Sequence, residues 1–197
     1  MKKTIFALLA SACVVLSAQA SVLTFDTLTP NHDSDGNVML TSMSNNQGYG
    51  GFTWNSNFLL GDTSYAGYAN GAHSGSNFVN NKGVNALSIS SSTAFDFAGA
   101  WFVAPNISGT KATSISISAY NAANSLIGTT GFVSIGNTYS FIAATFKDVS
   151  KIVINRDKGF FAMDDFTLAD SAVPEPSGLF GVGLAAALLL ARRKRAS

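Results

Sequence analysis

The sequence predicts an all-β domain, a two-sheet β-sandwich of jelly-roll type, and its composition is the first evidence. Between Ser21 and Val173 there is no glutamate and there are only five lysines, while Ser, Thr, Asn, Gly, Phe, Val and Ile are plentiful. Strong helix formers are therefore scarce, and residues that favour strands and turns dominate. Short alternating runs, separated by turns roughly every eight to twelve residues, are typical of sandwiches and jelly rolls.

The first half of this domain predicts short strands between long polar loops. We expect strands at 22–27, 38–42 and 52–54, and a turn at 31–37. Residues 61–83 are rich in Gly, Asn and Ser and lack hydrophobic periodicity, which indicates a long loop or several loops with short edge strands.

Regular strands are expected in the second half of the domain. The clearest is 113–120, where Ile115 and Ile117 alternate with serines and so predict one buried and one exposed face. The other runs with strand character are 86–90, 93–97, 100–103, 126–132, 139–146, 151–155 and 160–168.

The N-terminus reads as a secretory signal peptide over residues 1–20. Two lysines follow Met1, an apolar run spans 5–16, and Ala18-Gln19-Ala20 is a small-x-small cleavage site. The mature chain would begin at Ser21 and contain no cysteine, because Cys13 is the only one. Lipoprotein processing at Cys13 is an alternative, but the apolar run before it is very short. Export through the Sec machinery is the prediction.

The C-terminus carries a hydrophobic segment between two distinctive motifs. A linker at 171–176 contains Pro174, Glu175 and Pro176, and an uncharged helix is expected at 177–191. Its apolar run from Leu179 spans only ~20 Å as a helix, against the ~30 Å of a bilayer core. The basic tail at 192–197 would stay cytoplasmic; its cations are Arg192, Arg193, Lys194 and Arg195. A short span of this kind suits a transient inner-membrane intermediate, and a permanent single-span anchor is the alternative.

These three features in this order resemble the PEP-CTERM sorting signal of Gram-negative bacteria. The resemblance covers 173–195 and implies processing by an exosortase, a membrane-bound cysteine protease or transpeptidase, in species that secrete exopolysaccharide. The motif Tyr49-x-x-Phe52-x-Trp54, together with 161–166, also resembles the body of many proteins with this tail. That second resemblance implies no activity. The expected destination is the cell surface or the exopolysaccharide matrix of a biofilm.

Charge and chemistry narrow the function of the domain at 21–170. Between Ser21 and Val173 there are six basic residues and ten aspartates, which give a net charge near −4. Nucleic acid is therefore not an expected partner. His32 and His73 lie in Gly- and Asn-rich segments without a nucleophile motif, which indicates solvated histidines rather than catalysis. The domain is therefore predicted not to be an enzyme. The alternative is a secreted polysaccharide hydrolase that uses two Asp carboxylates.

Aspartates near both ends of the domain form a candidate structural calcium site. Alternation over 160–168 predicts Asp164 on the apolar face and its neighbour Asp165 on the opposite face. A buried carboxylate must be hydrogen-bonded, paired or metal-bound. If the first and last strands are neighbours, Asp26 joins this pair, and oxygen ligands of this kind suit Ca²⁺. The alternative, which we favour, is that Asp164 accepts hydrogen bonds from turn backbone.

A second acidic segment and several aromatic residues complete the candidates. Residues 33–37 contain two aspartates but lack the spacing and the glutamate of an EF-hand, so an Asx turn is expected. Tyr65 and Tyr68 lie in the long loop and are predicted surface residues that could stack on sugar rings, whereas Trp54 and Trp101 lie in strand patterns typical of a core. The sequence thus favours a non-catalytic binding or structural module, with exopolysaccharide as a candidate ligand.

Overall fold

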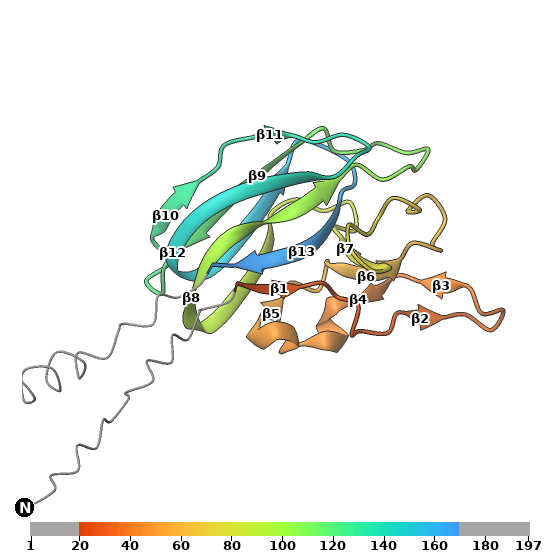
Figure 1. The fold of residues 1–197 in the computed structure, drawn as a ribbon, viewed down its shortest axis with the longest axis horizontal. Coiled ribbons are helices and arrows are strands. Elements are labelled where there is room, and N and C mark those ends of the chain that lie inside the picture. Colours follow the sequence, from red (N-terminus) through yellow and green to blue (C-terminus); the bar gives the residue numbers. More distant parts are fainter. Residues whose placement is uncertain (1–19, 170–197) are drawn as a thin grey trace, which may run out of the picture. The chain divides into compact units, whose positions relative to one another are not determined.

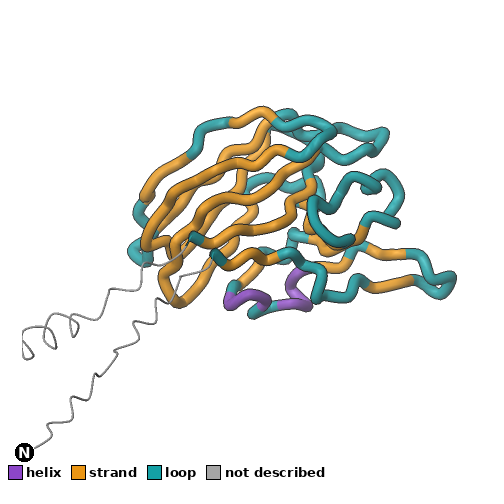
Figure 2. Tube along the Cα trace, in the orientation of Figure 1, coloured by secondary structure: helices purple, strands orange, loops and turns teal. Residues whose placement is uncertain are grey.

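The computed structural model describes residues 20–169, which belong to one compact unit. Within these residues helix is confined to two short 3₁₀ turns, η1 (Met43–Asn46) and η2 (Tyr49–Gly51), and the rest of this range is strand or loop (Figure 2). The all-β prediction is confirmed. Within this range no helix is long and apolar enough to cross a membrane. The predicted signal peptide, linker, C-terminal helix and basic tail lie outside the described residues.

Two long antiparallel strands organise the domain (Figure 1). β8 (Leu87–Val103) and β12 (Ser140–Arg156) each contain 17 residues, where the sequence predicted three strands and two. The first half of β8 pairs with β5 (Thr53–Trp54) and its second half with β13 (Ala162–Leu168), while the second half of β12 pairs with β9 (Ser114–Tyr120). Three register shifts between β8 and β12 allow this pair of strands to bend from one layer into the other.

The remaining strands extend the sheet on both sides of this strand pair. The order is β10-β9-β12-β8-β13-β7-β6-β4, with β1 beside β13 and β11 beside β9. The first and last strands are neighbours, the condition on which the predicted calcium site depended, since Ser21 pairs with Leu168. The strands not yet given are β1 (Ser21–Leu23), β4 (Thr41–Ser42), β6 (Leu59–Asp62), β7 (Asn77–Asn80), β10 (Leu126–Thr129), β11 (Val133–Ser134), and the separate pair β2 (Asn31–His32) and β3 (Val38–Met39).

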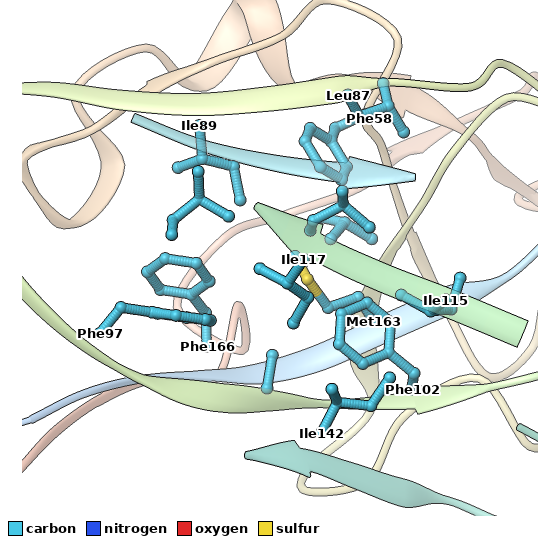
Figure 3. Close-up of a cluster of buried hydrophobic side chains, with 14 of the residues drawn as sticks. Phe58, Leu87, Ile89, Phe97, Phe102, Ile115, Ile117, Ile142, Met163 and Phe166 are labelled. Carbon is cyan, nitrogen blue, oxygen red and sulfur yellow. The ribbon is translucent and has the colours of Figure 1, made fainter. Parts of the chain in front are cut away.

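The hydrophobic core lies between the two halves of the folded sheet. Leu87 and Ile89, from the start of β8, lie on one side of it, and Phe97 and Phe102, from the end of the same strand, lie on the other (Figure 3). Ile117 is fully buried between them, as its alternation predicted. The adjacent polar face is not wholly exposed, because Ser116 is also buried.

Candidate functional site

Three aspartates from the two ends of the domain hold one loop. This carboxylate-bound loop, residues 73–77, leads into β7, and its partners are Asp26, just after β1, and the adjacent pair Asp164 and Asp165 in β13. The partners are 50 to 92 residues away in sequence. Because β1 pairs with β13, both chain ends of the domain contribute to fixing this loop.

Asp164 is fully buried and accepts three backbone hydrogen bonds. Its Oδ2 atom accepts from the N–H groups of His73 at 2.8 Å and Ser74 at 2.9 Å, and its Oδ1 accepts from the N–H of Asp165 at 2.7 Å. Burial raises the pKa of Asp164 to about 7, a shift that the neighbouring Asp165 carboxylate reinforces and the donated hydrogen bonds oppose. This is the hydrogen-bonded arrangement that the sequence favoured over calcium.

Asp165 lies beside the same loop, and the prediction that it projects to the opposite face is wrong. Its φ of +48° coincides with a register shift of β13 against β8, and this bulge interrupts the alternation. Asp165 is 7% exposed. Its Oδ2 lies 2.6 Å from His73 Nδ1, and its Oδ1 accepts a hydrogen bond of 2.6 Å from Ser74 Oγ.

Asp26 fixes the other end of the loop. Its Oδ1 atom accepts from the N–H groups of Ser76 at 2.9 Å and Asn77 at 3.0 Å. The three predicted calcium ligands thus reach one loop, and each uses at least one carboxylate oxygen for a hydrogen bond to it. Over residues 20–169, no group of three or more His, Cys, Asp or Glu side chains could hold a metal ion. Calcium binding stays a prediction, which chelation tests.

His73 is not the solvated side chain that its loop composition predicted. Besides its contact with Asp165, its ring stacks on Trp101 with centroids 3.9 Å apart and an interplanar angle of 11°. Tyr139 packs edge-on against the same imidazole, at 5.2 Å. His73 is therefore oriented by a carboxylate and two aromatic rings. The hydroxyl of Ser74 donates to the carboxylate, so these contacts do not form a Ser-His-Asp relay.

Trp101 and Phe141 form the outer part of the same cluster. They are direct cross-strand partners in β8 and β12, with ring centroids 5.3 Å apart. Trp101 is half-buried, against the core position that its strand pattern predicted, whereas Trp54 is in the core as expected. Phe141 is 39% exposed. We call His73, Trp101, Tyr139 and Phe141 the aromatic surface.

Gly99 allows the Phe141 ring to lie against the sheet. A Cβ atom at this position would lie 2.7 Å from Phe141 Cζ and 2.5 Å from the carbonyl oxygen of Ile142. The φ of Gly99, +143°, is also rare for residues with a side chain. Glycine at position 99 thus leaves room for the ring on the backbone of β8.

Tyr139 contributes a buried hydroxyl to this cluster. The hydroxyl has no hydrogen-bond partner among the described residues. Burial raises the pKa of Tyr139, and the Asp164 and Asp165 carboxylates raise it further. The phenol is therefore neutral at physiological pH.

The two tyrosines proposed as sugar-stacking residues have different environments. Tyr68 is 3% exposed and stacks on Phe78 at 5.0 Å, so the prediction that it lies on the surface is wrong. A Gly-rich loop can still bury an aromatic ring when it folds back over a sheet. Tyr65 is half-buried and lines an open pocket of about 490 Å³, whose other lining residues are Gly36, Asn37, Val38, Ser64 and Ala66.

The acidic segment 33–37 is an Asx turn, as expected. The Oδ1 atom of Asp33 accepts hydrogen bonds from the backbone N–H groups of Asp35 and Asn37. The Asn37 side chain and then its backbone lower the pKa of Asp33. The carboxylate thus caps its own turn.

Comparison of the sequence with known proteins does not assign this chain to a family. No family model matches the sequence, and no curated protein matches it. Among solved structures, the chain is similar to the K2 cleaved adhesin domain of Lys-gingipain, with TM-score 0.46, 11% identity and coverage of 78% of this chain and 99% of that one.

Two further solved structures show a similar level of likeness. One is TmCBM61 in complex with β-1,4-galactotriose, with TM-score 0.39, 13% identity and coverage of 73% of this chain and 100% of that chain. The other is the CBM22-1–CBM22-2 tandem domain of Xyn10C from Paenibacillus barcinonensis. For it the TM-score is 0.42, the identity 11%, and the coverage 85% of this chain and 50% of that one.

Proposed function

We propose that this chain is an exported protein of the cell surface or exopolysaccharide matrix whose β domain binds carbohydrate without catalysis. The observation that carries the proposal is the aromatic surface. Phe141 is 39% exposed on an outward strand face, and Trp101 and His73 stack beside it. Exposed aromatic rings on a rigid sheet offer an apolar face for sugar rings at little cost in conformational entropy.

The buried aspartates support a binding role better than a hydrolytic one. A glycosidase needs two carboxyl groups on either side of the scissile bond. Asp164 and Asp165 are adjacent in sequence, are buried, and accept hydrogen bonds from the same loop. Their geometry accounts for the position of His73, and through it for the packing of Trp101. The polysaccharide hydrolase therefore has less support, and an assay for released reducing sugar tests it.

We expect Phe141→Ala to weaken glycan binding about tenfold, which corresponds to about 1.4 kcal/mol, because the variant loses a stacking ring. The measurement is a glycan-array screen followed by titration of the glycans that bind. Phe132→Ala is the matched control, since Phe132 is 61% exposed but lies outside the aromatic surface. Equal losses in both variants, or none in either, would contradict a site at Phe141.

The C-terminal segment is proposed to be a signal that an exosortase removes. The mature protein should then end near Pro176 and be recovered outside the inner membrane, as intact-mass analysis of native material can establish. Replacing Pro174, Glu175 and Pro176 with alanine should leave the protein in the inner membrane. A native chain that still ends at Ser197 would identify a permanent anchor instead.

A further inference from the structure

We propose that the aromatic surface selects neutral polysaccharides and excludes polyanionic ones such as polyuronates. This inference rests on the proposed carbohydrate-binding function and adds the chemical class of the ligand. It follows from the residues that surround the rings on the outward face of β8, β12 and β13.

The aromatic surface continues into small, neutral side chains. Along β12, Phe141, Ala143 and Thr145 are exposed, while Ile142 and Ala144 between them are buried in the core. The partner of Ala143 on β8 is Gly99, and that of Gly99 on β13 is Thr167. A sugar chain that lies on Phe141 and extends along the sheet therefore meets methyl, hydroxyl and bare backbone groups.

The residues with charged side chains in the strand segments of this face are all aspartates. In the strand segments 96–103, 139–146 and 162–169 there is no lysine or arginine, and the acidic residues are Asp96, Asp164 and Asp165. Asp164 is the direct cross-strand partner of Trp101. His73 is the nearby imidazole, and its Nδ1 already faces the Asp165 carboxylate at 2.6 Å.

Two of the cations elsewhere in the domain have other partners. Arg156 donates to the carbonyl oxygens of Gly83 and Val84, and Lys151 donates to Asn124 and lies 4.6 Å from the ring centroid of Tyr120. Lys147 is exposed on β12, but it is six residues beyond Phe141, or ~20 Å along an extended strand.

This charge distribution disfavours an acidic ligand. Carboxylate and sulfate groups are usually recognised by arginine or lysine, and like charges that face each other across an interface lower affinity. A polyuronate on Phe141 would bring a carboxylate to each sugar ring, close to Asp164 and Asp165 and without a compensating cation. A neutral pyranose stacks on the same ring without this repulsion.

Titrations of the full chain with neutral β-glucan, galactan and xylan, and with alginate and polygalacturonate, test the inference at low and at moderate salt. We expect a neutral glycan to bind in a manner that depends on Phe141, and each polyuronate to bind at least tenfold more weakly at low salt. Ala143→Lys, which adds a cation on the outward face beside Phe141, should raise the ratio of polyuronate affinity to neutral-glycan affinity several-fold at low salt, and unchanged selectivity in this variant would contradict the electrostatic explanation.

Two results would overturn the inference, and only one of them would also refute the proposed carbohydrate-binding function. Polyuronate binding that equals or exceeds neutral binding, and that Phe141→Ala abolishes, would leave the proposed function in place and refute the selectivity. Absence of binding to every glycan tested would remove the proposed function and the selectivity with it.

Discussion

Ile117→Asp is expected to destabilise the domain by about 4 kcal/mol or more, because it buries an unpaired charge in the core. Ile117 is fully buried in β9 and is the direct partner of Ile154 in β12. The core around it contains side chains from both layers of the folded sheet (Figure 3). Urea unfolding of residues 21–171, followed by circular dichroism, measures the loss.

Ser118→Asp is the matched control for this substitution. Ser118 is the next residue of the same strand and is half-exposed, so its new carboxylate stays hydrated and the effect should be small. If Ile117→Asp does not fold, Ile117→Ala should still cost about 2–5 kcal/mol. Equal stability of the Ile117→Ala and wild-type proteins would show that β9 does not pack as described. A helix-dominated spectrum of the wild type would contradict the fold.

Asp164→Ala is expected to cost about 1–3 kcal/mol for the amide donors that it leaves unsatisfied. It removes the acceptor of the His73, Ser74 and Asp165 N–H groups, so the carboxylate-bound loop should also become more mobile. Thermal melts measure the stability, and hydrogen exchange at residues 73–77 measures the loop. Asp35→Ala is a suitable control, because Asp35 is an exposed aspartate in the Asx turn.

Chelation separates the two interpretations of Asp164 within the same experiment. If hydrogen bonds alone hold the loop, EDTA should leave the melting temperature unchanged in the wild type and the variant. If calcium binds with the help of Asp26, EDTA should lower the melting temperature and added Ca²⁺ should restore it. In that case Asp164→Ala and Asp26→Ala should each abolish the response. A melting temperature that neither EDTA nor Asp164→Ala changes would contradict the burial of this carboxylate.

Composition and alternation predicted the strands well but not their continuity. The polar residues at 91–92 and 147–148 were left between the predicted strands, yet they lie within β8 and β12. Their side chains are largely exposed where the two long strands bend from one layer to the other. Polar residues signal solvent exposure, and local sequence does not distinguish a bent strand from a chain reversal.

The residues of the candidate site were only partly predictable. The sequence identified Asp164 as a buried carboxylate from its strand position, and it linked Asp26 to the same site on the condition that the first and last strands are neighbours. It missed the role of His73, since the interacting Asp165 is 92 residues away and reaches it through a bulge. It also missed Phe141, because the apolar run at 141–144 does not reveal which side chains face outward.

Tryptophan fluorescence during glycan titration tests the central claim most directly, because the domain has one buried and one half-exposed tryptophan. Trp54 is 1% exposed in the core, while Trp101 belongs to the aromatic surface. We predict that a glycan that binds the wild type changes its emission, and that Trp101→Phe loses this change. Binding that leaves the emission unaltered, or that alters it equally in Trp101→Phe, would show that carbohydrate does not bind at the aromatic surface.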